Sequence, residues 1–118
     1  MKVEVQLDRA IRQKLEKLNK PETKTQIHQV LADMCNPYVP YNTGQLANNV
    51  QVSYEGVRYS AVKDGHQYAA EAYNGTNMQF RTDQHPLASA RWEKAMLRDH
   101  RDEFNARVKE ILVEALNG

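Results

Sequence analysis

The chain is poor in cysteine, with one among its 118 residues. A single cysteine can form neither an internal disulfide nor a cysteine-based zinc site, which excludes a small secreted domain held together by disulfides. The sequence also has no HExxH motif, no glycine-rich phosphate loop and no acidic calcium loop, and its four histidines are scattered. We therefore expect no metal and no cofactor.

Long apolar runs and an excess of charge of one sign are also missing. No stretch approaches the ~18 apolar residues that cross a bilayer, and the N-terminal residues lack the apolar core of a secretion signal. We therefore expect a soluble protein that does not contact a membrane. The 16 lysines and arginines nearly balance the 15 acidic residues, for a net charge of +1. A dedicated nucleic-acid-binding protein usually carries a clear basic excess.

The size of the chain predicts one domain over residues 1–118. A domain of this size buries roughly two-thirds of the surface that its unfolded chain exposes. Hydrophobic residues make up 41% of the chain and the mean hydropathy is -0.78. The core is therefore thin for an isolated monomer, and the domain would gain stability from the surface of a partner.

Apolar residues at steps of three and four predict three helices. In the first helix these residues are Ile11, Leu15 and Leu18, and in the second they are Ile27, Val30, Leu31 and Met34. Pro21 would end the first helix, Thr23 would cap the second, and Pro37 would end the second. The third helix, about 87–116, is the longest. Its apolar stripe is Trp92, Met96, His100, Phe104, Val108, Ile111, Leu112 and Ala115.

Charges on this last helix predict two ion pairs at a spacing of four residues, Arg98 with Asp102 and Glu103 with Arg107. The rest of its balanced charge is typical of a solvated face. Because His100 falls on the apolar stripe, we interpret it as a core or interface histidine.

Alternating residues predict the strands. Residues 1–7 form a strand or an extended arm, and residues 50–54 and 57–61 form a hairpin that turns at Glu55-Gly56. A second turn follows at 63–65. Residues 68–73 fit either a strand or a short helix, and their three alanines favour helix. With a long, mobile loop at 74–86, the whole pattern predicts an α+β domain with two N-terminal helices and a long C-terminal helix on a small, mainly antiparallel sheet.

No arrangement of residues predicts an enzyme. Cys35 lies seven residues after His28, or about 10 Å along a helix, which is too far for a nucleophile–base hydrogen bond. We interpret Cys35 as a buried structural thiol. Between 99 and 103, His100 with Glu103 is the one convergent pair that includes a histidine, and surface charge explains it better than a metal site.

Tyrosines in or beside the loops favour an assembly protein, because tyrosine is enriched in protein–protein interfaces. They are Tyr38, Tyr41, Tyr68 and Tyr73. Ordinary packing against the sheet explains any one of them equally well.

Three segments, in order, resemble motifs of the tailed-bacteriophage minor capsid and tail-completion proteins, small components of the head–tail neck. Residues 38–46 (YVPYNTGQL) resemble VPxxTGxL, residues 68–76 (YAAEAYNGT) resemble YAxxxxxGT, and residues 85–92 (HPLASARW) resemble TPxxGxRW before the terminal helix. We take the matching residues as candidates for family-motif or interface positions. They are Val39, Pro40, Thr43, Gly44, Leu46, Tyr68, Ala69, Gly75, Pro86, Arg91 and Trp92.

The resemblance implies a structural virion protein, made in the bacterial host cytoplasm, that sits at the head–tail junction. It implies a homo-oligomeric ring that surrounds the DNA channel without sequence-specific binding and contacts other neck, portal-side and tail proteins. A ring needs heterologous contacts, in which one face of a subunit meets a different face of the next. The candidate contact elements are the N-terminal arm and the loops at 37–44 and 74–85.

The alternative is a small cytoplasmic nucleic-acid-binding or regulatory module that uses the basic N-terminal helices. Residues 1–24 hold seven basic and four acidic residues, a net charge of +3, whereas residues 25–90 carry −2 and residues 91–118 are neutral. Against this alternative, no aromatic residues lie among the N-terminal cations to stack on bases. The same uneven charge also suits the orientation of one subunit against the next.

Overall fold

The computed structural model describes residues 2–3, 9–39, 49–60, 62–63, 66–67, 69–75, 87 and 91–117. The predicted α+β class is confirmed, including the long C-terminal helix. The elements are β1 (Lys2–Val3), α1 (Arg9–Leu18), α2 (Pro21–Cys35), a 3-10 turn η1 (Asn36–Tyr38), β2 (Val50–Ser53), β3 (Gly56–Tyr59), β4 (Val62–Lys63), β5 (His66–Gln67), α4 (Ala69–Asn74) and α5 (Trp92–Asn117).

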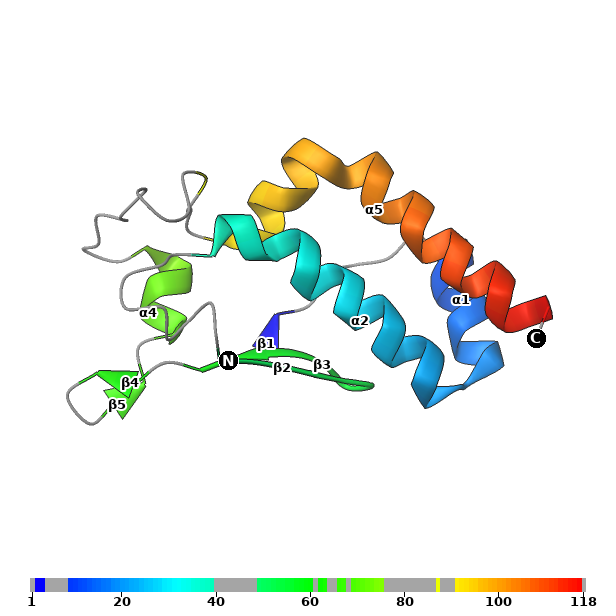
Figure 1. The fold of residues 1–118 in the computed structure, drawn as a ribbon, viewed down its shortest axis with the longest axis horizontal. Helices are drawn as coiled ribbons and strands as arrows, with labels where there is room; N and C mark the ends of the chain where they lie inside the picture. Colours follow the sequence, from blue (N-terminus) through cyan, green and yellow to red (C-terminus); the bar gives the residue numbers. More distant parts are fainter. Residues whose placement is uncertain are drawn as a thin grey trace.

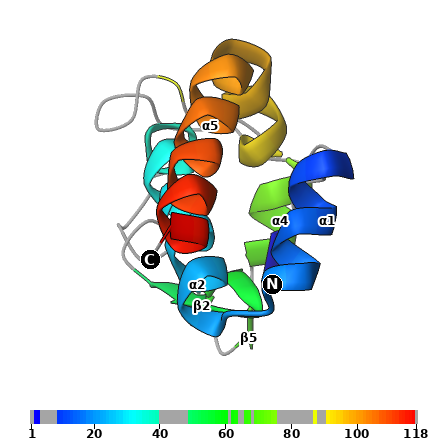
Figure 2. The same ribbon diagram turned by 90° about the vertical axis from the view of Figure 1, so that its right-hand side faces the viewer.

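Three layers organise the molecule, with α2 in the middle. An antiparallel sheet in the order β1-β3-β2 forms the first layer. Helix α2 crosses one face of this sheet and α5 lies over α2 (Figure 1). Helix α1 lies to one side and contacts α5 (Figure 2). Because α2 is covered by the sheet and by α5, it buries Thr23, Ala32 and Cys35 in addition to Ile27 and Leu31.

The junction of α1 and α2 differs from the prediction. Asn19 ends α1 with a positive φ of 49°, and its N–H donates to the Leu15 carbonyl at 3.0 Å. Pro21 is the first residue of α2, Lys20 takes the N-cap position, and Thr23 is buried within the first turn, so the prediction of Thr23 as the cap was wrong. The fixed φ of proline suits the first helical position, where no N–H is needed.

The β2–β3 hairpin turns one residue earlier than predicted. Ser53 pairs with Gly56, so the loop residues are Tyr54 and Glu55. The Glu55 N–H donates to Ser53 Oγ at 3.2 Å. Gly56 starts β3 with φ 148°, a conformation that glycine adopts without the steric cost of a Cβ atom.

Helix α5 starts at Trp92, five residues later than predicted, because Arg91 has a positive φ of 50°. Its backbone is kinked at His100 (φ −136°, ψ 27°), and Figure 1 shows that α5 changes direction along its length. The His100 side chain is 46% exposed, so the core alternative of its interpretation was wrong, and the interface alternative stays a prediction.

The rest of the predicted stripe on α5 does face the core. Trp92 and Met96 are buried before the kink, and Phe104, Val108 and Leu112 are buried after it. The predicted pair of Glu103 with Arg107 is confirmed at 3.1 Å. Arg98 bonds to Asp99 rather than to the predicted Asp102, because the kink follows directly and breaks the helical spacing.

Between the hairpin and α5, residues 69–74 form the helix that their alanines favoured. Strands β4 and β5 pair through Val62↔Gln67 and Lys63↔His66, which flank the predicted second turn. Residues 64–65 of that turn and residues 76–86 of the loop predicted at 74–86 lie outside the described residues, whereas Asn74 still belongs to α4. No helix in the described part is both long and apolar enough to span a bilayer.

Candidate subunit interface

The described motif residues lie mainly in the core. Val39, Ala69 and Trp92 are at most 2% exposed, so they pack inside their own chain and are not contact-surface residues. Gly75 follows α4 with φ 71°, and its N–H donates to the Ala72 carbonyl at 3.2 Å. Arg91 is the exposed member of this set. The other candidates, Pro40, Thr43, Gly44, Leu46, Tyr68 and Pro86, lie outside the described residues.

Two of the motifs meet at Trp92. The indole ring lies between Tyr59 of β3 and Tyr73 of α4, each in an edge-to-face contact with ring centroids 5.0 Å apart. The Arg91 N–H donates to the Tyr73 carbonyl at 2.7 Å. We call the side chains of Tyr59, Tyr73, Trp92 and Glu93 the Trp92 junction, since they join β3, α4 and α5.

A buried carboxylate completes this junction. Glu93 is 4% exposed, and its Oε1 accepts a hydrogen bond from the Tyr73 hydroxyl. Among the described residues, its Oε2 has no hydrogen-bond partner. No sequence pattern singles out Glu93, because it is one of many charged residues on this helix.

Burial at the junction keeps neighbouring acidic groups protonated. Burial, and then the nearby Glu93 charge, raises the pKa of the Cys35 thiol from 9.0 to about 12. The pKa of Tyr73 is also raised, first by burial and then by its hydrogen bond to Glu93. A buried thiol that stays protonated is a poor nucleophile, which agrees with the structural role predicted for Cys35.

A second polar cluster lies at the kink of α5. The hydroxyl of buried Tyr38 donates to Asp99 Oδ2 at 2.7 Å, and Arg98 donates to both carboxylate oxygens at 2.9 and 3.2 Å. These bonds, from Arg98 first and then Tyr38, lower the pKa of Asp99 to about 2. The hydrogen bond between Tyr38 and Asp99 thus connects η1 to α5.

The two clusters correct the interpretation of two loop tyrosines. Tyr38 is 2% exposed and Tyr73 packs on Trp92, so both serve the fold rather than an interface. Tyr41 and Tyr68 lie outside the described residues.

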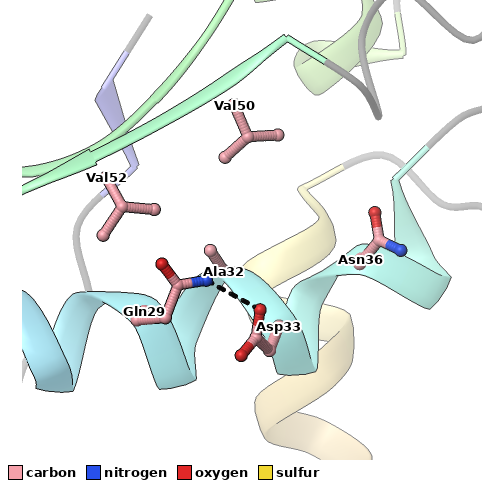
Figure 3. Close-up of a pocket in the computed structure, with 6 residues that line it drawn as sticks. All are labelled: Gln29, Ala32, Asp33, Asn36, Val50 and Val52. Atoms are coloured by element: carbon pink, nitrogen blue, oxygen red, sulfur yellow. Dashed lines mark hydrogen bonds between the residues drawn. The ribbon is translucent and has the colours of Figure 1, made fainter.

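An open groove lies between α2 and β2 (Figure 3). It has a volume of about 430 Å³, with a polar wall from α2 and η1 and an apolar wall from β2. Gln29 Nε2 donates to Asp33 Oδ1 at 2.8 Å along the polar wall. The six lining residues are Gln29, Ala32, Asp33, Asn36, Val50 and Val52. No motif marks this groove, so sequence reasoning did not find it.

Helix α1 presents a basic face. Arg9, Arg12, Lys14 and Lys17 are exposed, and Glu16 is the one acidic residue of this helix. Within the part of the chain that the structure describes, none of these four cations forms an ion pair. The described residues also contain no group of three or more side chains suited to hold a metal ion.

These features define a small α+β domain in which sequence motifs hold the fold together, while a groove and a basic helix remain open. Residues 1–110 match the model of the family described as "Minor capsid protein". The chain therefore belongs to this family of bacteriophage minor capsid proteins, and the predicted resemblance is confirmed. The family identifies a structural protein of the phage, located in the virion. Searches of the curated proteins and of the solved structures found no match.

Proposed function

We propose that this minor capsid protein is a component of the head–tail connector, where identical subunits form a ring around the DNA channel and complete the junction with the tail. The observation that carries the proposal is the family match over residues 1–110. The ring would contact other neck, portal-side and tail proteins, and would enclose DNA without reading its sequence.

Two different open surfaces support a ring. The groove is lined by the C-terminal half of α2, whereas the basic helix α1 precedes the N-terminus of α2. A subunit with different surfaces at its two ends suits heterologous contacts, which generate rings when the rotation closes. The net charges of +3 over residues 1–24 and −2 over residues 25–90 favour the same head-to-tail arrangement.

The test is the position of the protein in phage particles. A peptide tag on the chain, labelled with gold in intact virions, should mark the head–tail junction. Image reconstruction of the neck should then show a ring at that level. Label on the capsid faces or at the tail tip, or particles with complete necks that lack the protein, would overturn the proposal.

The basic face of α1 favours a second candidate, a nucleic-acid-binding module. A module of this kind would bind a random-sequence DNA duplex at micromolar concentrations, and its affinity would fall strongly between about 50 and 200 mM salt. The variant Lys14→Glu/Lys17→Glu should then abolish binding, whereas the control Lys94→Glu/Lys109→Glu on α5 should not. For a neck protein we expect no such complex with either the natural chain or the variants.

A further inference from the structure

Strand β2 has backbone groups at its outer edge, beside the groove, that pair with no other strand among the described residues. The Ser60 N–H donates to the Asn49 carbonyl at 3.2 Å, so these two residues form a hydrogen-bonded pair of the β2–β3 ladder. Hydrogen-bonded and non-bonded pairs alternate in an antiparallel ladder. Gln51–Arg58 and Ser53–Gly56 are therefore the next bonded pairs, and the N–H and C=O groups of Val50 and Val52 point away from β3.

The same two valines line the groove with their side chains (Figure 3). Within the described residues, no strand pairs with the outer edge of β2. An extended chain placed along this edge would satisfy the free N–H and C=O groups and would place alternate side chains in the groove. The ligand that these groups fit is therefore a β-strand.

The opposite edge of the sheet is formed by β1. The backbone N–H and C=O of Arg58 bond to β2. Those of the preceding residue, Val57, therefore point to β1, where Val57 pairs with Val3. The alternation then leaves the backbone N–H and C=O of Lys2 on the outer side of β1. The sheet thus has two unlike edges: β1 includes the basic residue Lys2, whereas β2 (Val50–Ser53) contains no charged residue. Asp33 adds a carboxylate to the groove beside the second edge.

We propose that the β1 edge of one copy adds to the β2 edge of the next, so that one sheet continues from subunit to subunit. This proposal rests on the ring put forward above. Because the two edges are unlike, with Lys2 on one and Asp33 beside the other, the contact is heterologous, as a closed ring requires. It also gives a hydrogen-bonding role to the outward backbone groups of Val50 and Val52, which no described strand of the same chain uses.

The decisive variant is Val52→Pro, with Val52→Ala as its matched control. Proline removes an N–H that β3 does not use, so the hairpin of the single chain is kept, and proline is tolerated on strand edges whose N–H faces outward. Both variants shorten the apolar side chain, but alanine keeps the N–H. Circular dichroism should show the same fold for both.

The readout is photo-crosslinking in assembled phage particles, with benzoylphenylalanine placed at exposed Gln51. The natural chain and Val52→Ala should give a product of two copies of this chain. Val52→Pro should lose about tenfold of that product, because one intermolecular hydrogen bond is lost and the proline ring blocks close approach. Equal crosslinking of the two variants, or crosslinks of the natural chain only to another virion protein, would overturn the proposal.

A charge variant keeps the proposal testable if Val52→Pro fails to fold. Asp33 is exposed, so Asp33→Lys should leave the fold intact and lower the two-copy product by about threefold, whereas the control Asp102→Lys on α5 should not. No difference between these two lysine variants would count against the edge-to-edge contact. Gold label at the neck together with failed crosslinks would refute the strand pairing alone, whereas label elsewhere would refute the ring as well.

Discussion

The Trp92 junction and the α2–β2 groove differ in almost every physical respect. At the junction, three aromatic rings pack edge to face and a buried carboxylate accepts a tyrosine hydroxyl. At the groove, side chains remain open and the edge of β2 keeps backbone groups without a strand partner among the described residues. Two of the three family motifs meet at the junction, whereas no described motif residue lines the groove. Among the described residues, therefore, the motif positions contribute mainly to the fold, and the groove contains none of them.

Removal of the Trp92 indole ring from the junction should have the largest effect on stability. Trp92→Ala removes a fully buried side chain and should lower the free energy of unfolding by about 3–5 kcal/mol. Urea denaturation followed by circular dichroism measures this loss. Tyr54→Ala is the control, because Tyr54 is 52% exposed and its truncation should change little. Similar losses at both positions would mean that Trp92 does not anchor the core.

Loss of the tyrosine hydroxyl should have the next largest effect. Tyr73→Phe leaves buried Glu93 without its donor and should cost about 1–3 kcal/mol, measured by the same denaturation. Glu93→Gln keeps an acceptor for the hydroxyl and serves as the partner variant in a double-mutant cycle. Additive effects of the two changes would show that the two groups do not interact.

At the kink of α5, a smaller effect should appear as a change in pH dependence. Because the pKa of Asp99 is lowered to about 2, its contribution to stability is complete above its ordinary pKa of 3.8 and is lost as the pH falls through 2. Tyr38→Phe should raise this pKa toward 3.8, so the acid-induced loss becomes smaller and ends at a higher pH. An NMR titration of the Asp99 carboxyl checks the shift. An unchanged pKa would show that Arg98 alone sets it.

The groove should respond least to truncation. Val52→Ala removes a half-buried side chain and should cost less than ~1 kcal/mol in a single chain. Its cross-strand partner provides the comparison, since Val57 is fully buried and Val57→Ala should cost about 1.5–3 kcal/mol. Equal costs would mean that the groove side of β2 is packed as tightly as the core.

Local patterns predicted most of the elements but not their ends. Apolar residues that recur every three or four positions correctly located α1, α2 and α5, and apolar residues at every second position located the hairpin, because each repeat reflects one buried face. They placed the start of α5 at about residue 87, since they contain no information about the positive φ of Arg91. They also missed Thr23 and Ala32 as core residues, because α2 is buried on two faces and a single stripe predicts only one.

The candidate site was predicted less well than the fold. Tyr38 and Tyr73 suggested an interface by composition, but each places its hydroxyl on a carboxylate of α5 more than ten residues away in the chain. The groove has no sequence signal at all, since it forms where residues 29–36 of α2 and η1 pass beside a strand edge. Contacts between distant segments decide such features, and no local pattern records them.

By itself, the sequence determined the α+β class, the helices and the hairpin, and membership of the bacteriophage minor capsid protein family, because these depend on local periodicity and on ordered motifs. Only the tertiary structure decided that Val39, Ala69 and Trp92 are buried, that α5 is kinked at His100, and that no strand among the described residues pairs with the outer edge of β2. The physical reason is that burial and strand pairing depend on which distant segments pack together. That outcome is settled by the whole fold.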